Sequence, residues 1–338
     1  MAETTPVTVL TGFLGAGKTT LLNHMLHQPA LARTAVLVNE LGEIGLDHLL
    51  VEKLDDNTVL LNAGCLCCTV RGDLLRALRE MLPRARREEI SRVVIETTGL
   101  ADPTPILATL MSDAVAASAY RLDSIITAVD AVNGSATLNA QPEAVRQVAV
   151  ADRIVLTKTD LADGDDLRKR LHRLNPGAPV IAAVRGVIDP AAVINVGLFD
   201  IGGKITDVRS WLDAEAYATP HEHHHHHPNR HDGRIQAFCL TFDEPLHWQG
   251  VASYLEMLIA TRGESLLRIK GILNLQGQDR PVVIHGVQHL FHPPVLLSAW
   301  PEQDPRTSRI VCITRDLPRD VIDEGFRAFE SAVRTEAA

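Results

Sequence analysis

The stretch GFLGAGKT at residues 12–19 decides the fold. It matches the pattern G-x-x-x-x-G-K-[ST] in full, and it stands between an apolar run at residues 7–10 and a helix-compatible run at residues 19–27. Glycines let backbone N–H groups turn inward around phosphate oxygens, and the N-terminus of the following helix adds a partial positive charge. The segment therefore predicts a strand, a phosphate-binding loop and a helix, in that order.

Two side chains of this loop carry chemistry. We expect Lys18 to bridge the β- and γ-phosphates of a bound nucleotide and the Thr19 hydroxyl to bind Mg²⁺. The alternative is a glycine-rich turn that matches by accident, which the strand–loop–helix context disfavours. The backbone cradle is expected from Gly12, Gly15, Ala16 and Gly17.

Apolar runs alternate with helical stretches up to about residue 213. Short runs rich in Val, Ile and Leu, separated by helices, favour a mainly parallel sheet covered on both faces. We therefore predict an α/β fold, with a P-loop NTPase domain followed by a smaller α/β C-terminal domain. In the first domain strands are expected at residues 7–10, 35–38, 58–61, 93–95, 125–129, 154–156 and 180–182, and helices at 19–27, 72–82 and 165–174.

A break in composition precedes the second domain. Residues 218–233 contain almost no apolar side chains and cannot contribute to a core. Beyond them, strand-like runs at 235–242, 267–275, 282–288, 295–300 and 309–314 and helices at 248–261 and 319–333 favour an antiparallel sheet. The expected boundaries are 1–213 for the P-loop domain, 214–233 for a linker and 234–338 for the C-terminal domain.

The composition of the chain narrows the function classes. Its 338 residues are 46% hydrophobic and 22% charged, which is typical of a soluble globular protein. A net charge of −9 disfavours nucleic acid or an anionic membrane as the main partner. No secretory signal and no apolar run of spanning length is visible, so we expect a cytoplasmic protein.

A second nucleotide motif is expected at residues 92–99, where an apolar strand ends in an acid and a glycine follows three residues later. Glu96 is placed to hold Mg²⁺ directly or through water, and the Gly99 N–H to touch the γ-phosphate. A strand with an acidic end is commonplace by itself. After a complete phosphate loop it becomes the best candidate for the second motif.

Guanine specificity is indicated by the sequence Thr157-Lys158-Thr159-Asp160 after the strand-like run at 154–156. A carboxylate at the base edge accepts from guanine N1–H and N2–H₂, two donors that adenine does not present together, so Asp160 would reject adenine. The usual form is Asn-Lys-x-Asp, and Thr157 replaces the Asn. The alternative is an ordinary strand-to-helix loop in which Asp160 caps a helix.

A metal site is predicted at Cys65, Cys67 and Cys68. Thiolates select Zn²⁺ and similar thiophilic ions over Mg²⁺ and Ca²⁺, and three sulfurs leave one tetrahedral position open. A buried cysteine cluster or a Cys67–Cys68 disulfide is the alternative. Glu43 is a candidate fourth ligand and Glu40 a candidate for orienting the attacking water, although both could equally be solvated loop carboxylates.

The linker adds a run of imidazoles that would collect Zn²⁺, Co²⁺ or Ni²⁺ with poor selectivity, with a merely solvated hinge as the alternative. Cys239 and Cys312, in apolar runs, are expected to be buried small hydrophobes. Isolated histidines such as His285, His289 and His292 are expected to fill surface or core positions. The histidines that form the metal-collecting run in the linker are His221, His223, His224, His225, His226 and His227.

Together these residues resemble the CobW-type family of P-loop GTPases, and in particular its YjiA-like zinc-chaperone branch. The resemblance covers nearly the whole chain, and Thr157 is shared with that branch. Val38 stands where some members of the branch carry a metal-binding Glu, so the ligands other than cysteine stay open. The matching segments are residues 12–20, which adds Thr20 to the nucleotide site, 39–45, 64–68, 96–99, 101–103, 157–160, 266–271 and 286–288.

The resemblance implies slow GTP hydrolysis, GTP-dependent transfer of a metal to a client metalloenzyme, and a nucleotide- or metal-linked homodimer. We therefore expect a GTP- and Mg²⁺-dependent Zn²⁺ metallochaperone. The alternatives are a cobalt chaperone of the cobalamin-synthesis or nitrile-hydratase type, a passive zinc buffer and a small-molecule kinase. The absence of an arginine-rich lid in the sequence disfavours the kinase.

Overall fold

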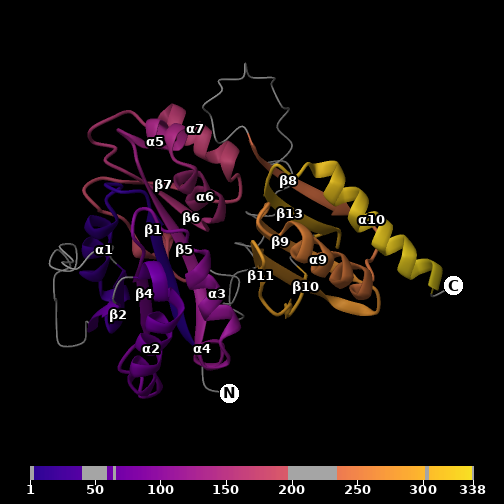
Figure 1. The fold of residues 1–338 in the computed structure, drawn as a ribbon, viewed down its shortest axis with the longest axis horizontal. Helices are drawn as coiled ribbons and strands as arrows, with labels where there is room; N and C mark the ends of the chain where they lie inside the picture. The colour runs from indigo at the N-terminus through magenta and orange to yellow at the C-terminus, as the bar shows by residue number, and fades with distance from the viewer. Residues whose placement is uncertain (1–3, 40–58, 64–65, 197–233, 301–303, 337–338) are drawn as a thin grey trace. The chain divides into compact units, whose positions relative to one another are not determined.

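The structure is a computed structural model that describes residues 4–39, 59–63, 66–196, 234–300 and 304–336, with the backbone alone at residues 39, 59–63, 66–71 and 336. The chain forms two compact units (Figure 1). The first comprises Met1–His172 and Ala178–Asp200, and the second comprises Arg173–Gly177 and Ile201–Ala338. The linker expected at 214–233 lies outside the described residues, so the domain boundaries stay predictions.

The first unit is built on a seven-stranded sheet with the order β3-β2-β4-β1-β5-β6-β7, and every one of its described strand pairs is parallel. The predicted parallel α/β domain is confirmed. The strands are β1 (Thr5–Gly12), β2 (Thr34–Asn39), β3 (Val59–Ala63), β4 (Arg92–Glu96), β5 (Tyr120–Asp130), β6 (Arg153–Thr157) and β7 (Val180–Ala183). The helices are α1 (Lys18–Leu26), α2 (Leu66–Arg86), α3 (Thr104–Ser112), α4 (Ala114–Ala119), α5 (Gly134–Ala140), α6 (Pro142–Val150) and α7 (Asp165–Leu174), with short turns η1 (Pro29–Leu31) and η3 (Pro190–Ala192).

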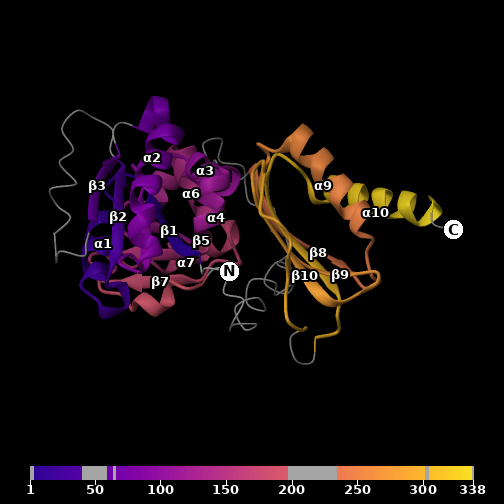
Figure 2. The same ribbon diagram turned by 90° about the horizontal axis from the view of Figure 1, so that it is seen from below.

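Helices cover both faces of this sheet (Figures 1 and 2). On one face, α1 packs in a core that includes Leu10, Val94 and Ile126. The next residue of β5, Thr127, points to the other face, where its hydroxyl donates to the Gln147 carbonyl of α6 at 2.7 Å. Burial on both faces explains why the strands are continuous apolar runs and do not alternate with polar residues.

Helix α2 is longer than its predicted span of 72–82, because it begins at Leu66 and ends at Arg86. A glycine inside a helix costs about 1 kcal/mol relative to alanine, which made Gly72 resemble a helix start. The buried residues Leu74, Leu78 and Met81 outweigh that cost. As a result, the first turn of α2 contains Cys67 and Cys68.

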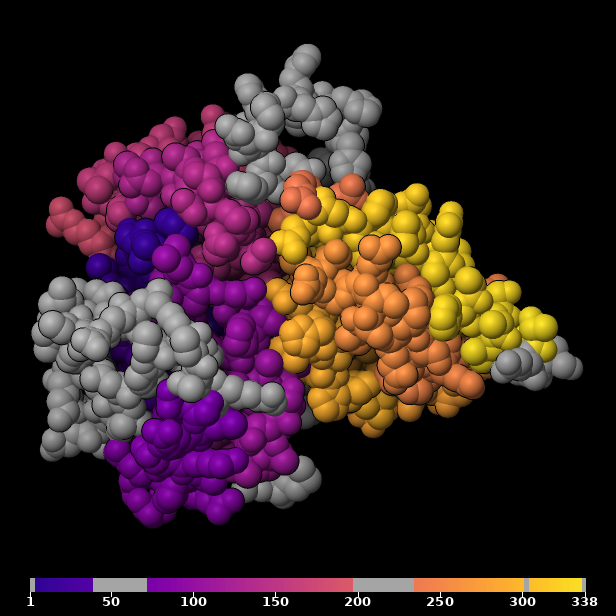
Figure 3. Space-filling view, viewed as in Figure 1, coloured from indigo at the N-terminus to yellow at the C-terminus, as the bar shows by residue number. Residues whose placement is uncertain are grey.

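The second unit has a six-stranded sheet with the order β11-β10-β9-β13-β8, in which β12 pairs with β10. All these described pairs are antiparallel, as predicted. Helices α9 and α10 lie on one face of the sheet (Figure 2), and the orange and yellow atoms of this unit pack against each other in the space-filling view (Figure 3). The elements are β8 (Ile235–Phe242), α9 (Trp248–Arg262), β9 (Leu266–Leu275), β10 (Gln278–Val287), β11 (Leu290–Phe291), β12 (Val295–Leu296), β13 (Ser308–Arg315) and α10 (Arg319–Glu336).

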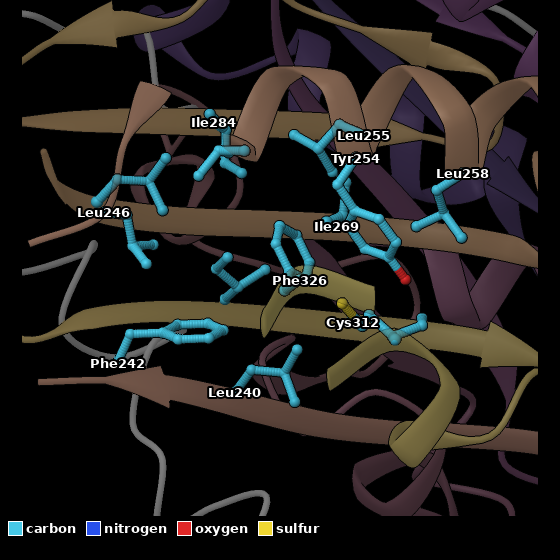
Figure 4. Packing of buried hydrophobic residues seen from close by; sticks show 14 of the residues in the cluster. Leu240, Phe242, Leu246, Tyr254, Leu255, Leu258, Ile269, Ile284, Cys312 and Phe326 are labelled. Atoms are coloured by element: carbon cyan, nitrogen blue, oxygen red, sulfur yellow. The ribbon is translucent and has the colours of Figure 1, made fainter. Parts of the chain in front are cut away.

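Aromatic rings fill the core between the two helices and the sheet (Figure 4). Phe326 of α10 packs edge-on to Tyr254 of α9, with ring centroids 4.5 Å apart, and lies 6.0 Å from the Phe242 ring. The helices approach closely because Gly325 leaves room for the tyrosine, where an added Cβ would lie 2.2 Å from the ring. In the same core Cys312 is fully buried, and burial raises the pKa of its thiol, as expected for an inert small hydrophobe.

One predicted strand is wrong in extent. The run at 295–300 forms only the two-residue strand β12, which pairs Val295 with Val283 and Leu296 with Val282. Beyond it the Leu297 N–H still donates to the Pro281 carbonyl at 3.0 Å, but Ser298 and Ala299 are exposed, so the run does not bury a continuous face that would extend the strand. Composition alone suggested a longer strand.

A buried ion pair ties together the strands of the first unit near their amino ends. The Arg92 guanidinium of β4 binds the Asp123 carboxylate of β5, and it also donates to the Thr8 hydroxyl of β1 at 2.9 Å. The backbone N–H of Asn195 donates to the same carboxylate at 2.9 Å, and the Asn195 side-chain carbonyl accepts from Arg92. These hydrogen bonds satisfy charges that would otherwise be costly to bury.

Breaking this ion pair should destabilise the first unit strongly. We expect Asp123→Ala to lower its free energy of unfolding by about 3–5 kcal/mol, because Arg92 is left charged and buried. Urea denaturation followed by circular dichroism measures the change. The surface pair of Arg327 and Asp323, whose side chains are 59% and 29% exposed, is the control, since Asp323→Ala should cost less than about 1 kcal/mol. Equal effects of the two substitutions would contradict the structural role given to Arg92.

Candidate nucleotide-binding site

The loop after β1 has the backbone that a phosphate cradle needs. Gly12, Gly15 and Gly17 have φ angles of 138°, 73° and 84°, a region that favours glycine. A Cβ at Gly12 would lie 2.3 Å from the Ala128 carbonyl of β5, so no other residue fits there. The sequence pattern therefore reflects both a left-handed turn and a close approach between neighbouring strands.

Lys18 lies at the start of α1 with its side chain almost fully buried. Its ammonium donates to the Gly12 carbonyl at 2.9 Å and to the Phe13 carbonyl at 3.3 Å. These contacts hold the charge within the loop, which is where the β- and γ-phosphates are expected.

Thr19 and Glu96 meet beside the loop. The Thr19 hydroxyl donates to the Glu96 Oε1 at 2.9 Å, and Glu96 is only 3% exposed at the end of β4. A hydroxyl and a carboxylate are hard oxygen ligands of the kind Mg²⁺ takes, so these two residues fit the predicted ion. The two come from positions 77 residues apart, and parallel β1 and β4 bring them together.

Gly99 follows β4 and packs directly against the phosphate loop, since a Cβ there would lie 2.4 Å from the Leu14 nitrogen. The Gln147 side chain of α6 holds the same segment by donating from Nε2 to the carbonyls of Gly99 at 3.2 Å and Ala101 at 3.0 Å. Sequence reasoning missed Gln147. Its neighbours give no signal, because Gln147 follows another polar residue, Arg146, in α6.

Thr157 connects the end of β6 to the phosphate loop. Its hydroxyl donates to the Ala16 carbonyl at 2.8 Å and lies 3.2 Å from the Val129 carbonyl. A hydroxyl at this position, in place of the usual Asn side chain, therefore still bonds the backbone of the loop.

Lys158 adopts a left-handed backbone, with φ of 56°, and reaches over the loop. Its ammonium donates to the Gly15 carbonyl at 2.8 Å and to the Asp130 carboxylate at 2.7 Å. Burial opposes ionisation of Asp130, but hydrogen bonds from Lys158, Asn133 and the Val132 N–H prevail and lower its pKa. Asp130, the second residue that sequence reasoning missed, is therefore charged at neutral pH.

Asp160 is exposed in the turn after Lys158, and its carboxylate lies 3.8 Å from the Arg185 guanidinium. It does not cap α7, which begins five residues later at Asp165, where the Asp163 carboxylate accepts the Asp165 N–H at 3.1 Å. The capping alternative for Asp160 is wrong. The Asp160 side chain is 29% exposed, so its carboxylate is accessible to a base edge.

The predicted metal site is described in part. Cys67 and Cys68 occur in the first turn of α2, directly after β3, while Cys65, Glu40, Glu43 and the linker histidines lie outside the described residues. Since all seven strands are parallel, β3 ends at the edge where β1 leads into the loop and β4 ends in Glu96. With strands spaced about 4.8 Å apart, β3 lies two strands, or about 10 Å, from β4. Among the described side chains, no cluster of three or more His, Cys, Asp or Glu is suited to a metal ion.

A phosphate loop, an acid-ended strand against its Thr, and a Thr-Lys-x-Asp turn bonded to the loop define a P-loop GTPase. The family of CobW/HypB/UreG nucleotide-binding domains matches residues 6–182, and the C-terminal domain of the cobalamin synthesis protein CobW matches residues 235–330. This chain belongs to the CobW/HypB/UreG family.

Similar proteins extend over almost the whole chain. The zinc chaperone YjiA of Escherichia coli strain K12 is 35% identical over 323 residues, covering 95% of this chain and 97% of the relative. The zinc chaperone CobW of Pseudomonas aeruginosa is 32% identical over 359 residues, covering 95% of this chain and 90% of the relative. The crystal structure of Zn(II)-bound YjiA GTPase from E. coli matches with a TM-score of 0.71 and 31% identity, covering 97% of this chain and 99% of that chain.

Among the described residues, no helix has the length and apolar character needed to cross a membrane.

The contact between Gly99 and the phosphate loop gives a test of the site. Gly99→Ala places a methyl group 2.4 Å from the Leu14 nitrogen, so the segment must move away. A displacement of about 1 Å can cost 100-fold in rate, and we expect a loss of that order in single-turnover GTP hydrolysis. Gly72→Ala is the control, because a Cβ there meets nothing within 4 Å. Unchanged hydrolysis by a folded Gly99→Ala protein would contradict the role of this contact.

Proposed function

We propose that this protein is a GTP-hydrolysing metallochaperone that binds Zn²⁺ at Cys65, Cys67 and Cys68 and transfers it to a client metalloenzyme. The observation that carries the proposal is topological. The helix turn that contains Cys67 and Cys68 begins at the same edge of one parallel sheet as the phosphate loop and Glu96. The relatives that span the chain are zinc chaperones by name, which supports the same function.

Hydrolysis would convert GTP and water to GDP and phosphate. Backbone N–H groups of the loop and the Lys18 ammonium would bind the phosphates, and Thr19 and Glu96 would hold Mg²⁺. When bound, that ion neutralises charge on the phosphate oxygens. Gly99, held by Gln147, offers its N–H to the γ-phosphate. Glu40 is our candidate for orienting the attacking water.

The cysteines would bind the cargo ion as thiolates. The thiolate, and not the thiol, is the form of cysteine that binds a metal ion. Three thiolates leave one position of a tetrahedral shell for Glu43, water or a ligand from the client. An incomplete shell allows the ion to leave as well as arrive. The linker histidines would collect metal, and the second unit would recognise the client.

The switch would work because the cysteines fall between the two nucleotide-sensing segments along the chain. Residues 39–45 precede them and Glu96–Gly99 follows, and both respond to the γ-phosphate in P-loop GTPases. Loss of that phosphate would then alter the geometry of the thiolates. A nucleotide- or metal-linked homodimer would add a second level of control. The reducing cytoplasm is the proposed setting, since it keeps the thiols free.

Soft ligands also accept Co²⁺ and Ni²⁺, so a cobalt chaperone is the second candidate. GTP turnover titrated separately with Zn²⁺, Co²⁺ and Ni²⁺ distinguishes the two, with Lys18→Ala and the triple Cys65→Ser, Cys67→Ser, Cys68→Ser variant as controls. A passive zinc buffer without a working nucleotide site would show no GTP turnover that the Lys18→Ala substitution abolishes.

Guanine recognition by Asp160 can be tested with a changed base. We expect Asp160→Asn to weaken GTP binding by at least about 100-fold, because an amide cannot accept from both guanine donors. Xanthosine triphosphate, which presents a carbonyl where guanine has its amino group, should bind the variant better than GTP does. Fluorescence titration measures both affinities. Asp163→Asn is the matched control, and a similar loss there would remove the assignment of Asp160.

Coupling between metal and nucleotide has its own test. We expect the Zn²⁺ affinities of protein loaded with a non-hydrolysable GTP analogue and with GDP to differ by about 5- to 150-fold, the usual range for allosteric coupling. Competition with a chromophoric chelator measures them. The triple serine variant should lose the high-affinity Zn²⁺ site while keeping GDP binding. Equal affinities in the two nucleotide states would overturn the switch.

A further inference from the structure

Arg185 lies in a tight turn that packs against the helix of the phosphate loop. The turn follows β7, and in it the Val187 N–H donates to the Val184 carbonyl at 2.9 Å. Both central residues are left-handed, with φ of 51° at Arg185 and 82° at Gly186, as in a type I′ turn. A Cβ at Gly186 would lie 2.6 Å from the Thr20 carbonyl oxygen, in the first turn of α1. This close approach places the backbone of Arg185 beside the residues that follow the phosphate loop.

From this turn the Arg185 side chain extends to Asp160, the carboxylate that we propose meets the base edge. Its Nε lies 3.8 Å from the Asp160 Oδ2, and the two side chains are 86% and 29% exposed. This separation is longer than a hydrogen bond, so the ion pair leaves the donors of one group and the acceptors of the other available to a ligand. Exchange of the pair for a ligand costs little, because exposed ion pairs contribute little to stability.

Two other donors close to Asp160 in the chain already bond to the protein. Thr157 has a single O–H, which it donates to a carbonyl of the phosphate loop at 2.8 Å. The Lys158 ammonium donates to another loop carbonyl at 2.8 Å and to the Asp130 carboxylate at 2.7 Å. Arg185, in contrast, carries several N–H donors in a planar fork and is mostly exposed. Of these three side chains, Arg185 therefore has the most donors to offer to a base.

Guanine presents acceptors as well as donors. Its N1–H and N2–H₂ would face the Asp160 carboxylate, while O6, which is next to N1 on the ring, and N7 both accept hydrogen bonds. The planar fork of an arginine side chain matches O6 and N7, and this pairing is the commonest specific contact to guanine in DNA recognition. A carboxylate and a guanidinium that lie next to each other therefore complement the neighbouring donors and acceptors of guanine. Adenine has an amino group in place of O6, and that group cannot accept from an arginine.

We propose that Arg185 is a specificity-determining residue that donates to guanine O6 and N7 while Asp160 accepts from N1–H and N2–H₂. Guanine would separate the ion pair and form hydrogen bonds with both of its members. The inference rests on the proposed guanine recognition, to which it adds a second reader of the base. Selection against adenine then has two sources, the missing donor pair at Asp160 and the missing acceptor at Arg185.

The nucleotide 7-deaza-GDP tests this contact, because a C–H group replaces N7 and the Watson–Crick edge of guanine is kept. Isothermal titration calorimetry of the full-length protein measures the dissociation constants of GDP and 7-deaza-GDP. We expect the wild-type protein to bind 7-deaza-GDP at least about fivefold more weakly than GDP, and Arg185→Ala to bind the two equally. The ratio of the two constants is the readout, because the GDP affinity of the variant also contains the release of Asp160 from its ion pair.

Arg76→Ala is the matched control. Arg76 is also an exposed arginine in an ion pair, 3.3 Å from Asp73 and 71% exposed, and its substitution should keep the wild-type ratio. Arg185→Lys keeps the charge but loses the planar fork, so it should move the ratio toward one. Equal binding of the two nucleotides by the wild-type protein, a result that needs no variant to fold, overturns the role of Arg185. An unchanged ratio in Arg185→Ala, as would occur if an ordered water held N7, also overturns it.

Asp160→Asn separates this inference from the proposed guanine recognition. If Asp160→Asn weakens GDP binding while the wild-type protein is indifferent to N7, only the role of Arg185 is overturned. If Asp160→Asn leaves GDP binding unchanged while the ratio still depends on Arg185, only the role of Asp160 is overturned. A wild-type protein that binds neither nucleotide overturns both.

Discussion

The structure of the first unit depends on the approach of the phosphate loop to its neighbours. At Gly12 the chain leaves β1 so close to the Ala128 carbonyl that only glycine fits. The backbone of the loop also accepts hydrogen bonds from the end of β6. The Thr157 hydroxyl donates to the Ala16 carbonyl, and the Lys158 ammonium donates to the Gly15 carbonyl. Gly99 completes the set by packing on Leu14. The loop in which a nucleotide would bind is therefore in contact with segments that follow several strands.

The two ends of the same sheet have different physical characters. Toward the amino ends, the buried Arg92–Asp123 pair with its hydrogen bonds to Thr8 and Asn195 is satisfied internally and leaves no charge for a ligand. At the carboxyl ends, charged and polar groups bond mainly to loop carbonyls or lie exposed, as Lys18 and Asp160 do. Exchange of such contacts for contacts to a ligand costs little, whereas disruption of the buried pair would cost several kcal/mol. The buried pair at the amino ends therefore stabilises the sheet, whereas the groups at the carboxyl ends can change partners when a ligand binds.

Much of the fold was predictable because its signals are local. Apolar runs between helices predicted the parallel sheet, and alternation predicted β8 within its observed bounds. Two motifs alone assigned both Thr19 and Glu96 to a Mg²⁺ ion, and the structure brings these two side chains together. Errors arose where packing overrides local preference: α2 continues through Gly72 because its apolar face is buried, and β12 stops after two residues because Ser298 and Ala299 of the run are exposed. Gln147 and Asp130 were missed because no pattern of neighbouring residues distinguishes them.

By itself, the sequence determined which residue types are available to this protein: a phosphate loop, an acid-ended strand, a carboxylate that we propose meets the base edge, and three closely spaced cysteines. Each of these motifs consists of residues that are close together in the sequence. Such residues stay close together in space whenever the local turn forms, so the motif can be recognised without the rest of the fold. Only the tertiary structure decided which of these motifs lie at the same edge of the parallel sheet, since that depends on the strand order β3-β2-β4-β1-β5. It also decided that a buried glutamine connects α6 to Gly99, and that Arg185 lies beside Asp160. Such features come from side chains brought together over long separations, for which the linear sequence carries no signal.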